Sequence, residues 1–359
     1  MGRAILLFSL LGTIVIGGNC LVADAPCQST DLGCDDGTRA LYFQPVPLVV
    51  VGGDNGTLWI SRNGGASFYP IVPASATANY ASVLITPNNR ILASGGDGAG
   101  NSYIVRSENF DTGWQVVYLN GGGDIYGLQV NPAGGFAAVR SNASTQAEIL
   151  LSEDGLQWSN TPVSVVGSPA GLHELNGTLY VGMQSVADFF VRVDPGPSFT
   201  PSINKPGGDT GMGAIHGAGL SVVIGLASND VYYRPEGGST WNTSPLGPSF
   251  SGCEDAAYGN GLFLVACPGN DELGVSFDGI SYTRALPTGV DLTSVASSVQ
   301  DIKFREGNFF ISGFTTGAPD TARMARSTDG QTWEMILLES NARAYSMDLK
   351  TSFQFLVPE

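Results

Sequence analysis

Aspartates that recur along the chain are the residues whose type and spacing best suit a shared chemical role. Six loops carry one each: Asp54, Asp97, Asp188, Asp230, Asp271 and Asp320. If these carboxylates converged on one face of the fold, they would suit Ca²⁺, which prefers oxygen ligands, or a cationic partner. The simpler interpretation is that Asp-Gly and Asn-Asp pairs form tight turns. We favour the turn role and expect no bound cofactor, with Ca²⁺ as the alternative.

Other patterns typical of enzymes are missing. The two histidines, His173 and His216, lie outside any His-Glu-x-x-His motif, and no Gly-x-Ser-x-Gly sequence marks a hydrolase nucleophile. Glu254 and Asp255 could serve as the paired carboxylates of a glycosidase. Consecutive strand residues point to opposite faces, however, so we expect these two not to face one substrate. We assign no catalytic residue, and the sequence favours a protein without enzymatic activity.

The composition argues against nucleic acid as a partner. The 359 residues include 16 Lys and Arg against 32 Asp and Glu, a net charge of −16. Only three of the basic residues are lysines, so the chain lacks a basic surface that would neutralise phosphates. Hydrophobic residues make up 43% of the chain, and 49 of its residues are glycines, as expected of a folded, turn-rich β protein.

A short repeat organises most of the chain. The segment 152–158, Ser-Glu-Asp-Gly-Leu-Gln-Trp, returns with the same Ser-x-Asp-Gly pattern at 276–282 and 327–333. A form one residue longer occurs at 61–68 and 234–241, and two decayed copies complete the series. Each copy ends on an aromatic residue, 41 to 51 residues after the previous one: Phe68, Trp114, Trp158, Phe199, Trp241, Tyr282 and Trp333.

Between the copies, apolar runs and turn residues indicate four strands in each period. Examples are an inner strand at 125–130, a second strand at 179–183 and an outer strand at 331–338. Four strands in about 44 residues is the pattern of a propeller blade. The sequence therefore predicts an all-β, seven-bladed β-propeller of four-stranded antiparallel blades. We expect 343–349 to lie beside 47–53 and complete the first blade, with an eighth partial blade as the alternative.

These segments resemble the Asp-box, also called the bacterial neuraminidase repeat, over about residues 46–350. In that family the box is a hairpin between the two outer strands of a blade, away from the ligand-binding face. The resemblance implies a structural role for the turn residues Asn63, Asp154, Asp278 and Asp329 and for the aromatic residues above. A carboxylate there accepts backbone N–H bonds, the glycine adopts positive φ, and the aromatic ring packs between sheets.

Sialidases are the best-known enzymes with this repeat, so the resemblance implies a sialidase-like fold. Their activity needs an arginine triad and an Arg-Ile-Pro motif, which is absent here. No triad is recognisable among the arginines that could lie on the central face: Arg140, Arg284, Arg305, Arg323 and Arg343. Exported propellers of this kind resemble photosystem II assembly factors and sortilin-type receptors, which are non-catalytic. We therefore predict a scaffold that binds a protein or glycan on its central face, with a carbohydrate-active enzyme, glycosidase or sialidase-like, as the alternative.

The N-terminus has the features of an export signal. Arg3 precedes an apolar run that is too short to span a bilayer, which predicts a signal peptide at 1–19. Gly17-Gly18-Asn19-Cys20 resembles a bacterial lipobox, which implies lipidation of Cys20, and cleavage after Ala25 is the alternative. A polar linker at 20–39 and one propeller domain at 40–359 follow. We expect a monomer in the periplasm or at the cell surface, bound to the membrane only through this lipid.

The other four cysteines suit an oxidising compartment. Cys27 and Cys34 could close a small loop in the linker, whereas Cys253 and Cys267 flank the turn signal Gly259-Asn260-Gly261. If Tyr258 faces Leu262 across this hairpin, then Cys253 faces Cys267. Cross-strand neighbours lie near the separation that a disulfide needs, so we predict this bond.

Overall fold

The computed structural model describes residues 43–355, except for 74–77, 143–145, 185–189, 194–198, 202–210, 226–229, 248–249, 251, 268–271, 286–297 and 316–318. Contacts divide the chain into two units, Pro47–Lys350 and a second unit of Met1–Val46 with Thr351–Glu359. The propeller is the first unit. The expected signal peptide and linker, with Cys20, Cys27 and Cys34, lie outside the described residues and remain predictions.

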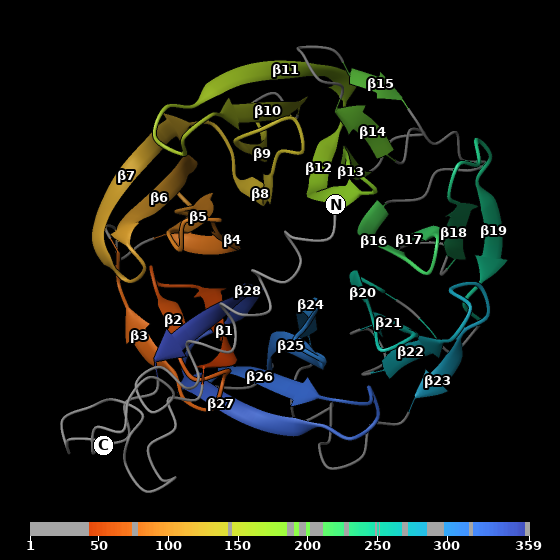
Figure 1. Ribbon diagram of the computed structural model, residues 1–359. Coiled ribbons are helices and arrows are strands. Elements are labelled where there is room, and N and C mark those ends of the chain that lie inside the picture. The colour runs from red at the N-terminus through yellow and green to blue at the C-terminus, as the bar shows by residue number, and fades with distance from the viewer. Residues whose placement is uncertain are drawn as a thin grey trace, which may run out of the picture. The chain divides into compact units, whose positions relative to one another are not determined.

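The described strands form seven four-stranded sheets, arranged around a centre (Figure 1). From the innermost strand outward, the first three sheets are β28 (Ala344–Phe355), β1 (Phe43–Gly53), β2 (Leu58–Ser61), β3 (Tyr69–Ile71); β4 (Asn79–Ile85), β5 (Ile91–Gly96), β6 (Asn101–Asn109), β7 (Thr112–Gly121); and β8 (Ile125–Val130), β9 (Phe136–Ser141), β10 (Gln146–Ser152), β11 (Ser159–Val166). The next two are β12 (Ser168–Leu175), β13 (Thr178–Gln184), β14 (Phe190–Val193), β15 (Phe199–Pro201); and β16 (Gly211–Gly217), β17 (Leu220–Gly225), β18 (Asp230–Pro235), β19 (Asn242–Pro245). The last two are β20 (Asp255–Gly259), β21 (Leu262–Cys267), β22 (Glu272–Ser276), β23 (Thr283–Ala285); and β24 (Ser298–Arg305), β25 (Asn308–Thr315), β26 (Thr321–Ser327), β27 (Glu334–Ser340).

The expected fold class, an all-β propeller of four-stranded antiparallel blades, is present. Neighbouring strands pair in the antiparallel sense, for example β20 with β21 and β25 with β26. Within the described ranges, no helix has the length and apolarity needed to cross a membrane.

The hydrophobic core lies in layers between neighbouring sheets. One cluster joins Leu264 and Val275 of one blade to Phe309 and Ile311 of the next, and another joins strands β1 and β2 to β4, β5 and β6. The second strand of a blade is covered on both faces, and every residue of β5, β17 and β21 is buried. Burial on both faces explains why these strands read as continuous apolar runs instead of alternating patterns.

The first sheet combines the two ends of the propeller sequence. Strand β28 is its innermost strand and pairs with β1, so a single sheet contains residues from the start and the end of Pro47–Lys350 (Figure 1). This is the pairing that the sequence predicts for 343–349 and 47–53. The described strands contain no partial eighth sheet. The hydrogen bonds of this sheet close the ring without a covalent link.

The Ser-x-Asp-Gly segments form tight turns between the two outer strands of a blade. Asp154 Oδ1 accepts the N–H groups of Leu156 and Gln157 at 2.8 and 3.2 Å, and Ser152 Oγ accepts that of Gly155 at 2.8 Å. Asp278 and Asp329 make the same bonds in their own turns, and Asn63 Oδ1 accepts the N–H of Ser67. Trp333 is buried, and five other aromatic ends pack between sheets: Phe68, Trp114, Trp158, Trp241 and Tyr282. Phe199 begins β15, and its side chain lies outside the described part.

We expect Asp154→Ala to lower the free energy of unfolding by about 1 kcal/mol, because two backbone N–H groups lose their acceptor. Glu153→Ala is the matched control, since this neighbouring acid is exposed and its replacement should change stability by less than about 0.5 kcal/mol. Urea denaturation measures both values. Equal effects of the two substitutions would contradict the structural role of the turn aspartate.

The predicted disulfide between Cys253 and Cys267 is present. The predicted register is wrong by one residue, because Gly259 pairs with Leu262 and Tyr258 pairs with Phe263. The turn is therefore the dipeptide Asn260-Gly261, with φ of 49° and 76°, the conformation that Asn-Gly favours at the centre of a two-residue hairpin. The bond still forms, because Cys253 precedes the strand and is not bound to its register.

Replacing both Cys253 and Cys267 with alanine should lower the free energy of unfolding by about 3 kcal/mol, the value for a loop of about 15 residues. Equilibrium denaturation measures this loss, with the Asp154→Ala protein as a reference of smaller effect. Peptide mass mapping without reduction should find the two cysteines linked in protein made in an oxidising compartment. Free thiols at both positions in that material would contradict the assignment.

Candidate functional site

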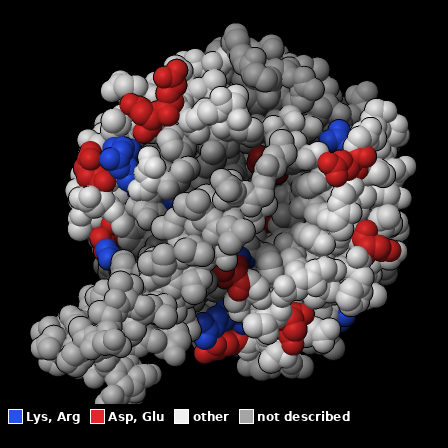
Figure 2. Space-filling model, viewed as in Figure 1, with Lys and Arg blue, Asp and Glu red and all other residues white. Residues whose placement is uncertain are grey.

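The innermost strands β4, β8, β12, β16, β20, β24 and β28 surround two adjoining cavities of about 340 Å³ each. One cavity lies near the start of these strands, and we call it the upper cavity. Its lining includes Tyr126, Gly171, Glu254, Gln300 and Tyr345. The other cavity lies nearer the ends of the innermost strands, and we call it the lower cavity. Its lining includes Leu84, His216, Tyr258, Phe304 and Asp348. Both are lined by Gln129, Asp255, Asp301 and Lys303. Figure 2 shows that the centre of the ring is hollowed.

Side chains of the innermost strands bond to the backbone of the next blade. An innermost strand has no sheet partner on its channel side, so its N–H groups there need other acceptors. The acceptors are side-chain oxygens of the preceding blade. The N–H groups of Leu128, Ile302, Met347 and Ile85 donate to Ser82, Asp255, Asp301 and Asp348, at 2.9, 3.1, 2.8 and 2.6 Å respectively. Three of the acids that line the cavities therefore hold neighbouring blades together.

Lys303 lies between two of these acids. Its Nζ is 2.8 Å from Asp301 Oδ1 and 3.7 Å from Asp255 Oδ2. Burial would lower the pKa of Lys303, but the two carboxylates outweigh it and raise the pKa, so the amine stays charged and is a poor nucleophile. Burial raises the pKa of Asp301 despite Lys303, and the Asp255 carboxylate adds to the effect.

Glu254 differs from the other acids because no backbone group of a neighbouring blade bonds to its side chain among the described contacts. Gln300 Nε2 donates to its Oε2 at 3.1 Å. Burial, with the Asp255 carboxylate, raises the pKa of Glu254 to about 7. Glu254 and Asp255 both line the upper cavity, as consecutive residues of β8 do, and the expectation that their side chains do not face one substrate stays a prediction. Because β20 begins at Asp255, strand alternation does not apply to Glu254.

The histidines and arginines do not form a catalytic group. His173 and His216 lie in innermost strands, as expected, and His216 Nδ1 lies 3.1 Å from Ser221 Oγ. Arg305 lines the lower cavity and donates to the carbonyl of Leu349 at 3.2 Å. Arg343 Nε donates to Asp320 Oδ2 at 2.7 Å, and Arg343 lines neither cavity. A sialidase-like arginine clamp is therefore not assembled from these residues.

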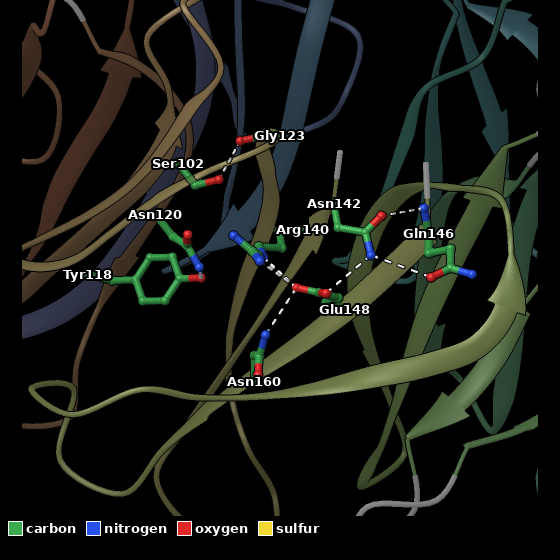
Figure 3. A network of polar contacts seen from close by, with 9 residues as sticks. All are labelled: Ser102, Tyr118, Asn120, Gly123, Arg140, Asn142, Gln146, Glu148 and Asn160. Carbon is green, nitrogen blue, oxygen red and sulfur yellow. Dashed lines mark hydrogen bonds and ion pairs between the residues drawn. The ribbon is translucent and has the colours of Figure 1, made fainter. Parts of the chain in front are cut away.

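Arg140 belongs to a separate buried network in the sheet of β8 to β11 (Figure 3). Its Nη2 and Nε lie 2.6 and 2.7 Å from Glu148 Oε2, and both side chains are largely buried. Asn142 and Asn160 donate to the same carboxylate at 3.2 and 3.3 Å, and Tyr118 of the adjacent blade lies against the guanidinium. Burial alone would raise the pKa of Glu148. The hydrogen bond and the charge of Arg140, with the bonds from Asn142 and Asn160, outweigh burial and lower it. The network is a structural ion pair, which the sequence does not reveal.

The recurrent loop aspartates bond mainly within their own loops. Asp97 accepts bonds from Asn101, Tyr103 and the Ala99 N–H, and the Asn101 side chain is the main cause that lowers its pKa to about 2. Arg343 brings two of the others together: Asp54 accepts its N–H and Asp320 pairs with its side chain. Asp230 begins β18, while Asp188 and Asp271 lie outside the described residues. Among described residues, no cluster of acids, histidines and cysteines could hold a metal ion.

By fold, the chain is a β-propeller, and several solved structures are similar to it. The periplasmic gluconolactonase PpgL of Pseudomonas aeruginosa is 11% identical, with a TM-score of 0.62 over 86% of this chain and 99% of that one. Virginiamycin B lyase of Staphylococcus aureus is 12% identical, with a TM-score of 0.58 over 73% and 85%. YCF48 bound to a D1 peptide is 16% identical, with a TM-score of 0.54 over 86% and 92%. These likenesses show the fold alone. No protein-family model and no curated protein matches the chain.

The raised pKa values of the buried acids predict that stability falls as the pH rises from about 4 to about 7. Burial raises the pKa of Asp348 to about 6 and that of Glu254 to about 7. Because unfolded carboxyls titrate near pH 4, the native state binds these protons more tightly, and the stability they give is lost between about pH 4 and pH 7. Urea midpoints should therefore decrease over this range.

Asp348→Asn should make that decrease shallower, because asparagine keeps an acceptor for the Ile85 N–H but carries no charge. Asp348→Ala should also lose about 1–3 kcal/mol, because it leaves this N–H without its acceptor. A wild-type stability that stays constant or rises over the same pH range would contradict the raised pKa values.

Proposed function

We propose that the protein is an exported bacterial propeller with seven Asp-box blades, anchored by a lipid on Cys20, that acts as a monomeric, non-catalytic scaffold for a protein ligand. The ligand presents a short segment to the upper cavity. The repeated Ser-x-Asp-Gly turns and the lipobox-like sequence at 17–20 support this assignment. YCF48, of similar fold, was solved with a bound peptide, which agrees with a scaffold role.

The observation that carries the proposal is the engagement of the channel acids. Asp255, Asp301 and Asp348 each accept a backbone N–H from the next blade, so a structural role accounts for their convergence. The remaining lining of the upper cavity includes Tyr126 and Tyr345, whose rings and hydroxyl groups suit a bound side chain. A preformed cavity of this kind binds without reorganisation of the scaffold.

A hydrolase acting on sugars or sugar lactones is the second candidate. The pKa of Glu254, about 7, suits a general acid or base near neutral pH. Asp255 lines the same cavity and could act as its partner. The similar fold of the gluconolactonase PpgL is compatible with this alternative.

Selection of random displayed peptides on the immobilised full chain tests the scaffold. Peptides that depend on the cavity should bind Tyr345→Ala and Gln300→Ala about 10-fold more weakly than wild type. Phe277→Ser is the control, because Phe277 is 78% exposed and lies outside both cavities, so binding should not change. Failure to enrich any peptide with this dependence would contradict the protein-binding proposal.

A parallel assay addresses the second candidate. The scaffold proposal expects no difference between wild type and Glu254→Gln in the hydrolysis of δ-gluconolactone or of nitrophenyl glycosides. Turnover that is abolished by Glu254→Gln would instead support the hydrolase. Binding to an array of glycans that depends on Tyr345, without binding to peptides, would replace the protein ligand with a glycan.

A further inference from the structure

We propose that the outer edge of β7 binds an extended segment of a partner protein by strand addition, and that this segment carries β-branched residues between basic ones. No residue of β7 lines either cavity, so the inference goes beyond the proposed function and does not depend on the ligand of the upper cavity. It follows from a comparison of the seven outermost strands, from exposed apolar side chains and from the charge of the chain.

The outermost strand of each blade has a sheet neighbour on one side only, so its free side presents unpaired N–H and C=O groups. Natural sheets protect such edges from other chains with short strands, prolines or charged residues. Six of the seven outermost strands are protected in this way. Strands β3, β15 and β19 contain a proline and have no more than four residues, β23 has three residues that include Arg284, β11 contains Pro162, and β27 contains Glu334 and Glu339.

Strand β7 is the exception (Figure 1). It has ten residues, and none of them is proline or charged. One register shift interrupts its pairing with β6, but β11 and β27 have such shifts as well, so this does not set β7 apart. Because bonded and non-bonded pairs alternate in an antiparallel sheet, alternate residues of β7 direct their N–H and C=O groups away from β6. In the described part of the chain no strand pairs with this side, so it is open to an added strand.

Exposed apolar side chains accompany this open edge. Trp114 packs in the core cluster shared with the first blade, and Val117 and Tyr118 pack in the cluster shared with the third blade. Val116 and Leu119 belong to neither cluster and are 43% and 62% exposed. The neighbouring outermost strand β3 has three residues and is too short to cover the whole length of β7. Side chains of an added strand would cover Val116 and Leu119, and β-branched residues suit such cross-strand pairs.

The charge of the chain favours a basic segment of another protein over a second copy. Two copies, each with a net charge of −16, would repel each other, whereas a basic segment is attracted. A carboxylate also lies beside the edge itself. Glu108 Oε1 accepts a hydrogen bond from Gln115 Nε2 of β7 at 2.8 Å, and the Glu108 side chain is 51% exposed. A basic residue at one end of the added strand would therefore have a local counter-charge.

Three labelled heptapeptides test the inference on the full chain by fluorescence anisotropy. The probe is fluorescein-Lys-Val-Thr-Val-Thr-Val-Lys-amide. One control has proline in place of both threonines, and the other has glutamate in place of both lysines. Wild type should bind the probe about 10-fold more tightly than the proline peptide, which cannot pair as a strand, and about 10-fold more tightly than the acidic peptide at low salt.

Two matched substitutions locate the binding. Leu119→Lys should weaken binding of the probe about 10-fold, because it places a charge on the edge. Leu337→Lys is the control, since Leu337 of β27 is 64% exposed and the change in net charge is the same, so binding should not change. Both positions are exposed, and urea midpoints check that both proteins fold. Tyr345→Ala in the upper cavity should also leave binding of the probe unchanged, which separates this edge from the proposed function.

Equal binding of the three peptides by wild type, or no binding of the probe at millimolar protein concentration, would overturn the inference without any substitution. Equal losses in Leu119→Lys and Leu337→Lys would also overturn it, because added charge would then act regardless of the edge. A loss in Tyr345→Ala would assign the probe to the upper cavity instead. Dimerisation of wild type that Leu119→Lys abolishes, measured by analytical ultracentrifugation, would replace the partner segment with a second copy.

Discussion

The unpaired inner edge of each blade is the constraint on which the centre of this propeller depends. An innermost strand has a sheet neighbour on one side only, and an unsatisfied buried N–H costs about as much as a lost hydrogen bond. A side-chain oxygen from the preceding blade meets this need at Leu128, Ile302, Met347 and Ile85. The acceptors fix the distance between blades and leave two cavities of defined size between the inner strands.

This use of acids determines the chemistry that remains for a ligand. Asp255, Asp301 and Asp348 each hold a backbone group, and Lys303 offsets part of their charge. The raised pKa of Asp348 reflects mainly its burial, so it does not by itself mark a catalytic acid. Glu254 is bonded by a side-chain amide of the next blade.

The sequence predicts the blades much better than the site. The Ser-x-Asp-Gly turns and their aromatic residues depend on local hydrogen bonds and on a repeated burial pattern, and both can be recognised from residue types alone. The carboxylates of Asp255, Asp301 and Asp348 accept backbone N–H groups that are 47, 46 and 263 residues away in the sequence. No local sequence pattern indicates such distant contacts. Their recurrence near the start of successive inner strands is the signal that could have identified them.

The hairpin between β20 and β21 shows why the predicted register was wrong by one residue. The turn signal Gly259-Asn260-Gly261 predicts three turn residues before Leu262. Asn260 and Gly261 both adopt positive φ, which favours a two-residue turn, so the register of the hairpin moves by one residue. Glu254 lies just before β20, which begins at Asp255, and alternation between faces holds only within a strand. The backbone N–H of Glu254 donates to the Ala266 carbonyl at 2.9 Å, and the adjacent disulfide of Cys253 fixes the segment. The segment that leads into β20 thus places both Glu254 and Asp255 on the lining of the upper cavity.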